Sequence, residues 1–242
     1  MKKEVILGVP FDALSFNEAL STLTGFLNSS GNHLAVTPNP EAVMLAQRDK
    51  NFMEIIQKAD LVLPDGIGII IAAKLLRLPI RERVPGFDIA VALLNNTAGN
   101  VKVYLLGAAP GIAEVAAKNL QAKGIQVCGA RDGYFDQGRE KEILDEINSL
   151  KPDILIIGMG MPKQEDWAHK NFSKLPCKIT MCLGGSIDIL AGNVKRAPKL
   201  MRAVGLEWLY RLISQPSRAR RMLDLPRFIA AVLRLALGNT HS

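Results

Sequence analysis

The chain has 242 residues, of which 48% are hydrophobic, 22% charged and 5% aromatic. This length suits one large domain, or one domain with an appendage, and the composition disfavours a disordered chain, a collagen-like repeat and a disulfide scaffold. The net charge is +7. All of this excess lies at one end, since residues 196–242 carry nine basic and two acidic residues. Such a segment favours a polyanionic partner, either nucleic acid or an anionic membrane surface, although a solvated basic face is also compatible with it.

Other global features narrow the class further. The three cysteines show no CxxC or Cys/His spacing, so we interpret them as buried small hydrophobes. No signal-peptide pattern follows the charged N-terminus, and no uncharged stretch approaches the roughly 20 residues of a membrane span. We therefore expect a protein that is not exported and is soluble or peripheral to a membrane.

Strands and helices are predicted in alternation along most of the chain. Runs rich in Val, Ile and Leu predict buried strands at 4–8, 33–37, 60–64, 101–107, 125–130, 153–158 and 178–184. Helical patterns occur at 15–28, 40–58, 67–76, 87–96, 110–123, 138–150 and 162–172. The first helix begins with a capping box formed by Ser15 and Glu18. This alternation predicts an α/β fold with a mostly parallel sheet flanked by helices, which binds ligands beyond the carboxyl ends of its strands.

The strand pattern stops near residue 195, where helical patterns at 198–214 and 217–238 take over. Pro216 and Pro226 interrupt them, and Asp224 is typical of the N-cap of a last helix. That helix, 225–237, carries the apolar residues Phe228, Ile229, Val232, Leu233 and Leu235. We therefore divide the chain into an α/β core, residues 1–195, and a basic amphipathic helical appendage, residues 196–242.

Polar residues stand at the ends of two predicted strands. Thr37 and Asn39 flank Pro38, which makes the turn rigid. Either this segment is only a rigid turn, or the Thr37 hydroxyl and the Asn39 amide form hydrogen bonds with a polyol ligand. Asp65 leaves a hydrophobic strand just before a helix. It is either an N-cap or a base that accepts a proton from a substrate hydroxyl, and the sequence leaves both interpretations open.

Other candidates would hold an anion. Arg83 lies in a charged turn and is either a solvated arginine or a ligand for a diphosphate. Three strand ends are rich in glycine, which permits close backbone approach, and together they suggest a nucleotide. The first, around Gly107, lacks the spacing of a dinucleotide-binding turn. The others contribute Gly158, Gly160 and Lys163, and Gly184, Gly185, Ser186 and Asp188.

Several common catalytic motifs are missing from the sequence. It contains no Walker A motif, GxSxG elbow, HExxH or Asp-x-Asp, and we interpret His33, His169 and His241 as structural. A reaction without a metal would need Arg, Lys and backbone N–H groups to neutralise a leaving diphosphate.

The motifs occur in a characteristic order. They are Thr37-Pro38-Asn39, Pro64-Asp65-Gly66, Arg83-Val84-Pro85-Gly86, Gly158-x-Gly160-x-Pro162-Lys163-Gln164-Glu165, Gly184-Gly185-Ser186-x-Asp188, Arg196-Ala197-Pro198 and Gly205-Leu206-Glu207-Trp208-Leu209. This set resembles the WecG/TagA/CpsF glycosyltransferase family, most closely its TagA branch, over about residues 5 to 226. The resemblance implies a Rossmann-like fold and inverting, metal-independent β-1,4 transfer with no cofactor. The donor would be UDP-N-acetylmannosamine and the acceptor the 4-hydroxyl of N-acetylglucosamine on undecaprenyl diphosphate, which builds the linkage unit of wall teichoic acid.

The resemblance also implies roles for individual residues. Asp65 would be the general base, Thr37 and Asn39 would line a sugar pocket, and Arg83 and Gln164 would assist near the diphosphate. The uridine would face Tyr134 and the turn made by Gly184, Gly185, Ser186 and Asp188, while Gly158, Gly160 and Lys163 would contribute to donor binding. No residue is expected to bind a metal.

For the appendage, the resemblance implies contact with the membrane and completion of the active site. We expect it to place the protein on the cytoplasmic face of the cell membrane, and we expect homo-oligomers away from the membrane. The arginines expected to meet the acceptor diphosphate and the anionic surface are Arg211, Arg218, Arg221 and Arg227, with Arg234 on the same segment.

Alternative functions differ in donor or in class. The donor could be the uronic acid of N-acetylmannosamine or another UDP-sugar. A nucleic-acid-binding protein fits less well, because the appendage pairs its arginines with Leu, Ile, Val and Phe. A nicotinamide-dependent oxidoreductase lacks its glycine fingerprint. We therefore expect no nucleic-acid partner.

Overall fold

The computed structural model describes residues 3–203, 205–214 and 223–238. Its main sheet has six strands, in the order β4-β3-β8-β7-β5-β6, and every neighbouring pair is parallel. The strands are β3 (His33–Val36), β4 (Leu61–Val62), β5 (Lys102–Gly107), β6 (Gln126–Arg131), β7 (Ile154–Gly158) and β8 (Ile179–Cys182). The predicted α/β, Rossmann-like fold is confirmed.

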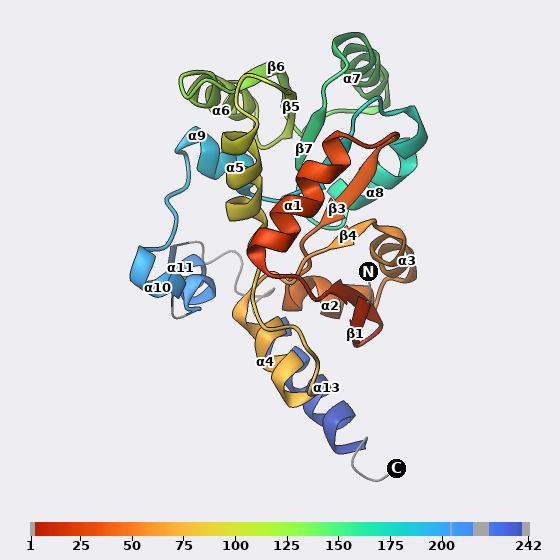
Figure 1. Ribbon diagram of the computed structural model, residues 1–242, viewed down its shortest axis with the longest axis vertical. Coiled ribbons are helices and arrows are strands. Elements are labelled where there is room, and N and C mark those ends of the chain that lie inside the picture. The colour runs from red at the N-terminus through yellow and green to blue at the C-terminus, as the bar shows by residue number, and fades with distance from the viewer. Residues whose placement is uncertain (1–2, 204, 215–222, 239–242) are drawn as a thin grey trace.

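Helices cover both faces of this sheet (Figure 1). On β5, Val103 and Leu105 enter the core of one face, while Tyr104 and Leu106 enter that of the other, as the two-residue period of a strand dictates. The first core is closed by α1 (Phe16–Leu27), α5 (Gly86–Asn96), α6 (Ile112–Gln121) and α9 (Ser186–Ala191). The second is closed by α2 (Pro40–Ala46), α3 (Lys50–Lys58), α4 (Ile67–Leu75), α7 (Gln137–Leu150) and α8 (Lys163–Asn171).

The N-terminal strand differs from the prediction. It is β1 (Lys3–Ile6), which pairs antiparallel with β2 (Val9–Asp12) in a separate two-stranded sheet. Leu7 and Gly8 form the turn with φ of 48° and 78°, the left-handed region that a two-residue hairpin turn needs. The predicted strand 4–8 does not include β2, whose Pro10 is tolerated because β2 is an edge strand.

Two predicted helices are divided in the structure. The segment 40–58 forms α2, which ends at Ala46, and α3. Asp49 caps α3, its Oδ1 accepting a hydrogen bond of 3.0 Å from the N–H of Phe52. The segment 198–214 forms α10 (Lys199–Ala203) and α11 (Glu207–Ser214). Gly205 stands between these two with φ of 77°. By contrast, the capping box of Ser15 and Glu18 is confirmed.

The last helix, α13 (Asp224–Gly238), packs against α2 and α4. It starts one residue before the prediction, and the Asp224 carboxylate accepts two hydrogen bonds from the Arg48 guanidinium, of 2.9 and 2.7 Å. Phe228 and Val232 are fully buried in the core that these helices share with the sheet. Part of the predicted appendage is therefore integral to the α/β core.

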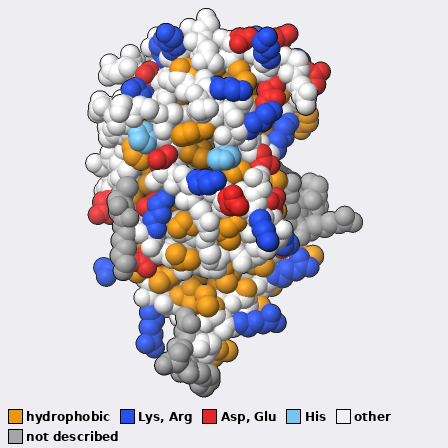
Figure 2. Space-filling view, turned by 90° about the vertical axis from the view of Figure 1, so that its right-hand side faces the viewer, with side chains coloured by type: hydrophobic (Ala, Val, Ile, Leu, Met, Phe, Trp, Pro, Cys, Tyr) orange, Lys and Arg blue, Asp and Glu red, His pale blue; other side chains and the backbone are white. Residues whose placement is uncertain are grey.

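The lower end of the molecule in Figure 1 is formed by α4 and α13, side by side. Figure 2 shows Lys and Arg side chains around apolar ones toward this end. Exposed apolar side chains include Ile71 and Leu75 on α4 and Leu233 and Leu237 on α13. Within the described ranges, no helix has both the length and the hydropathy to cross a membrane.

Candidate active site

A cavity lies at the carboxyl ends of four adjacent strands, β4, β3, β8 and β7, where the turns after them meet. This is the edge at which parallel sheets bind ligands. Of the residues to which a role was assigned above, nine line it: Thr37, Asn39, Asp65, Arg83, Gly160, Gln164, Gly184, Gly185 and Ser186. The fold therefore gathers side chains that are up to 149 positions apart in the chain.

Asp65 lies in the turn between β4 and α4. Its N–H donates to the carbonyl of Pro38 at 3.3 Å, which ties this turn to the end of β3. The N-cap of α4 is Gly66, with φ of 91° and no side-chain capping bond, so the N-cap interpretation of Asp65 is wrong. The Asp65 carboxylate lines the cavity wall, and its role as a base stays a prediction.

Thr37 and Asn39 hold the end of β3 rigidly. Asn39 Oδ1 accepts a hydrogen bond of 3.0 Å from the N–H of Ala42 and so caps α2. Thr37 packs against Gly86, where an added Cβ would stand 2.5 Å from the threonine hydroxyl oxygen. Only glycine at the start of α5 leaves room for Thr37, so both predicted residues keep fixed places in the cavity wall.

Two guanidinium groups line the same cavity. Arg83 donates through Nη2 to the backbone carbonyl of Arg202. Arg196 binds both oxygens of Asp88, at 2.5 and 3.1 Å, and lies 4.5 Å from the centre of the Phe87 ring. These contacts fasten the segment around α10 to α5. Arg196 was part of a motif quoted above but received no role, because nothing in its spacing shows that it returns to the cavity.

The glycine turns after β5, β7 and β8 pack backbone against backbone. A Cβ at Gly107 would stand 2.4 Å from the carbonyl oxygen of Gly158, and one at Gly158 would stand 2.7 Å from that of Gly184. The glycine at 158 thus allows the strand ends to approach, and it does not itself line the cavity.

Three further predicted donor-binding residues lie outside the cavity lining. Lys163 donates from Nζ to the carbonyl of Gly133 at 2.6 Å and lies 5.9 Å from the centre of the Tyr134 ring. Tyr134 is 69% exposed. Asp188, on α9, accepts a hydrogen bond of 3.2 Å from Asn193. The structure therefore does not bring these side chains together with Asp65.

Gln164 and Glu165 open α8 and are almost completely buried in the cavity wall. The Gln164 Oε1 accepts from the N–H groups of Gly184 and Gly160, at 2.9 and 3.2 Å, and its Nε2 donates to Glu165 Oε1 at 2.7 Å. Burial raises the pKa of Glu165 to about 7. The sequence analysis missed Glu165 as a site residue, although it directly follows Gln164.

The cavity is lined by both negatively and positively charged side chains. The carboxylates of Glu41, Asp65, Glu165 and Glu207 line it together with the guanidinium groups of Arg83 and Arg196. This combination suits removal of a proton from a hydroxyl beside an anionic group. Within the described part of the chain, no three His, Cys, Asp or Glu residues gather closely enough to hold a metal ion.

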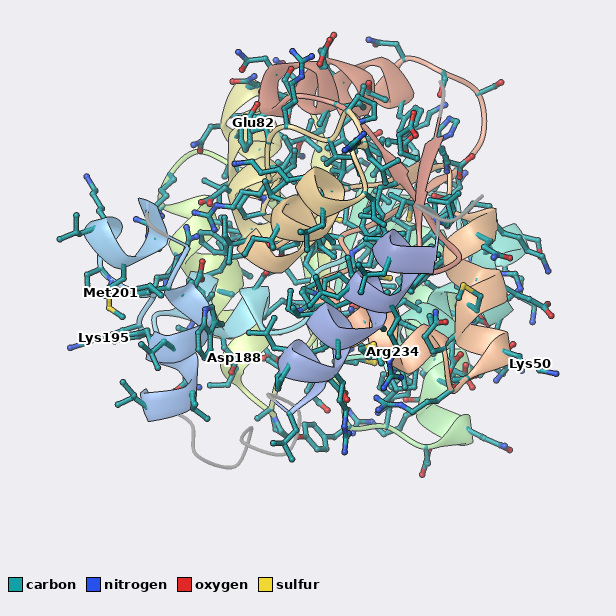
Figure 3. The ribbon with its side chains drawn as sticks, turned by 90° about the horizontal axis from the view of Figure 1, so that it is seen from below. Lys50, Glu82, Asp188, Lys195, Met201 and Arg234 are labelled. Carbon is teal, nitrogen blue, oxygen red and sulfur yellow. The ribbon has the colours of Figure 1, made fainter. Side chains whose placement is uncertain are left out.

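The arginines predicted to contact the acceptor are spread over the C-terminal region. Arg227 pairs with Asp224 at 3.3 Å, Arg234 is exposed on α13, and Arg211 lies on α11. Arg218 and Arg221 fall outside the described residues. In Figure 3, Arg234 lies on α13, whereas Lys195 and Met201 lie to one side with the segment that carries α10.

Comparison with known proteins agrees with the motifs. A family model described as "Glycosyl transferase WecG/TagA/CpsF family" matches residues 4–242. The chain therefore belongs to this family of glycosyltransferases.

Two relatives carry the same name, N-acetylglucosaminyldiphosphoundecaprenol N-acetyl-beta-D-mannosaminyltransferase. The relative from Bacillus spizizenii is 35% identical over 214 residues, which cover 87% of this chain and 82% of the relative. The relative from Staphylococcus aureus strain MRSA252 is 35% identical over 228 residues, which cover 93% of this chain and 89% of the relative. The resemblance inferred from the ordered motifs is confirmed.

Proposed function

We propose that this protein transfers N-acetylmannosamine from UDP-N-acetylmannosamine to the 4-hydroxyl of N-acetylglucosamine on undecaprenyl diphosphate. This is the reaction that builds the linkage unit of wall teichoic acid. The names of the two relatives support this donor over its uronic acid and over other UDP-sugars. The observation that carries the proposal is the place of the Asp65 carboxylate in the cavity wall, next to the end of β3.

The proposed chemistry is a single displacement. Asp65 accepts the proton of the acceptor hydroxyl while that oxygen attacks the anomeric carbon of the donor, and UDP leaves from the opposite side, which inverts the configuration. Charge builds up on the leaving diphosphate. Arg83 lines the same cavity and offers guanidinium N–H groups for that charge, which is the kind of stabilisation that speeds such a step. The Nη groups of Arg196 bind Asp88, so this arginine holds the cavity wall.

We propose that the reaction needs no divalent cation. Arg83 supports this, because its guanidinium group supplies positive charge in the cavity where many sugar-nucleotide enzymes use a metal. Chelation with EDTA is expected to leave turnover unchanged, whereas Arg83→Ala is expected to reduce it. Dependence on added Mg²⁺ or Mn²⁺ in a chelated sample would contradict this part of the proposal.

We further propose that the protein works at an anionic membrane surface, where its acceptor resides. The surplus of positive charge beyond residue 195 supports this, and so do the exposed side chains Leu75 and Leu237 on adjacent helices. Apolar side chains that enter the interface, with arginines near the headgroups, combine hydrophobic and electrostatic attraction. The buried residues Phe228 and Val232 are not available for this role.

The decisive experiment is turnover of the purified protein with a lipid-linked N-acetylglucosamine acceptor. UDP-N-acetylmannosamine, its uronic acid and UDP-N-acetylglucosamine are offered in parallel, and we expect product from the first donor. A product from the uronic acid alone would move the assignment to the alternative donor. Absence of transfer from all three donors would remove the proposal.

A further inference from the structure

The side-chain amide of Gln164 bridges two strand ends. Gly160 follows β7 and Gly184 follows β8, and the N–H groups of both donate to the single oxygen Oε1 of Gln164. Gln164 is only 3% exposed. Its side chain thus connects, within the protein, the two glycine turns of the cavity wall.

Glu165 determines which way this amide points. Its Oε1 accepts from Gln164 Nε2 at 2.7 Å, and the residue is 5% exposed. If the amide were turned over, its NH₂ group would face two N–H donors and its oxygen would face a carboxylate. Donors would then oppose donors and acceptors would oppose acceptors, so Glu165 fixes the oxygen toward the glycine turns.

The surroundings of the pair are largely apolar. Phe52 and Ile56 of α3 and Cys182 of β8 line the same cavity, and Cys182 Sγ lies 3.7 Å from the carbonyl oxygen of Gln164. The titratable groups that act on Glu165 are Asp166 on its own helix and Cys182 on β8. With few polar neighbours, the Gln164 amide is the principal hydrogen-bond partner that holds the Glu165 side chain.

We propose that Gln164 and Glu165 are a positioning pair that sets the spacing of the Gly160 and Gly184 turns, and that Gln164 acts through these turns rather than by contact with substrate. The inference rests on the proposed function, in which this cavity binds the UDP-sugar. Displacement of a binding wall by about 1 Å costs up to roughly 100-fold in rate. Loss of the pair should therefore lower turnover although neither side chain touches the reacting atoms.

Exchange of the two residues tests the pair. The substitution Gln164→Glu places a second carboxyl group next to that of Glu165. The two groups can share a proton and form a hydrogen bond at low pH, but they repel each other when both are ionised. We expect this variant to lose roughly tenfold or more of wild-type kcat/KM at pH 8 and less at pH 6. The double variant Q164E/E165Q restores one carboxylate opposite one amide, and is expected to recover most of the rate at pH 8.

Controls separate positioning from direct contact and from general charge effects. Gln137→Glu adds the same charge at an exposed site on α7 and should follow the wild-type pH profile. If Gln164 contacted substrate through its amide, the double variant would be as impaired as Q164E, and that result would overturn the proposal. A flat pH profile for Q164E relative to wild type would overturn it as well.

Thermal unfolding midpoints of the same variants give a readout that does not depend on the reaction. The midpoint of Q164E should lie further below that of wild type at pH 8 than at pH 6. In the double variant, this dependence of the deficit on pH should disappear. If the wild-type protein fails to transfer the sugar, the proposed function fails, and the midpoints alone decide whether the pair exists. Equal midpoints for Q164E and wild type at both pH values would then refute the pair.

Discussion

The cavity and the C-terminal helices are organised by different forces. In the cavity wall, polar side chains are held by short hydrogen bonds to backbone groups, as Asn39 caps α2 and Gln164 bridges two glycine turns. On α13, apolar burial dominates, with Phe228 and Val232 inside the core and Leu233 and Leu237 exposed. The comparison shows that the site is defined by hydrogen-bond geometry, whereas the position of α13 is defined by which neighbour covers its apolar face.

The largest effect is expected at the cavity, from Asp65→Asn. The amide keeps the shape of the carboxyl group but cannot accept the proton, so transfer should fall by about 10² to 10⁴. Calorimetric titration with UDP and the thermal midpoint should change little, because asparagine is close in size and shape to aspartate. An Asn variant with the parent rate would show that Asp65 is not the base.

The next effect is on stability, from Phe228→Ala. Loss of a fully buried phenylalanine costs about 3–5 kcal/mol, which denaturant unfolding measures directly. Leu237→Ala serves as the control, because Leu237 is exposed on the same helix.

The charge pattern alone suggests that truncation at residue 195 leaves the core intact, but removal of α13 uncovers α2 and α4, so we expect a clear loss of stability. A truncated chain as stable as the full one would mean that α13 is dispensable.

A smaller effect is expected from Asp224→Asn. The Arg48 guanidinium, which donates two hydrogen bonds, holds the pKa of Asp224 below its ordinary 3.8. The ion pair therefore stabilises the fold fully above pH 3.8, and this contribution is lost as the pH falls through the lower folded-state pKa. We expect a deficit of about 1 kcal/mol at pH 7, since Arg48 is half exposed.

Denaturant titrations of the parent and the Asn variant between pH 7 and pH 3 check this behaviour. The difference in the free energy of unfolding should stay constant down to about pH 5 and shrink below pH 4. A difference that grows on acidification would contradict the sign of the pKa shift.

The smallest effect concerns the outer face of the same helices. Leu75→Asp combined with Leu237→Asp should weaken sedimentation with anionic vesicles threefold or more, because both side chains are exposed at the end formed by α4 and α13. Val115→Asp is the matched control, since Val115 is an exposed apolar residue on α6. Equal vesicle binding by the parent protein and all variants would show that this face does not bind the membrane.

The sequence predicted the sheet well because its strands are buried on both faces and read as continuous apolar runs. It did not predict β2, because the strand predicted at 4–8 runs through the turn at Leu7 and Gly8. It joined α2 to α3 because the helical pattern at 40–58 continues through Asp49. These errors follow from local patterns that do not report tertiary neighbours.

For the cavity, strand ends and glycine turns were sufficient to find Thr37, Asp65 and Gln164, because parallel strands bring their carboxyl ends to one edge. Arg196 and Glu165 were missed as site residues. Arg196 reaches the cavity through its ion pair with Asp88, 108 positions away, and no local pattern encodes such a return. Glu165 belongs to the cavity only because the first turn of α8 faces it.

The backbone contacts among Gly107, Gly158 and Gly184 limit how this cavity can be redesigned. A Cβ at Gly107 would stand less than 3 Å from the carbonyl oxygen of Gly158, and a Cβ at Gly158 would stand less than 3 Å from that of Gly184. A side chain at either position would therefore force the strands apart. A library that aims to reshape the cavity for other sugars should therefore leave this side unchanged. Its randomised positions belong away from these strand ends, as at Leu225, which reaches the cavity from α13.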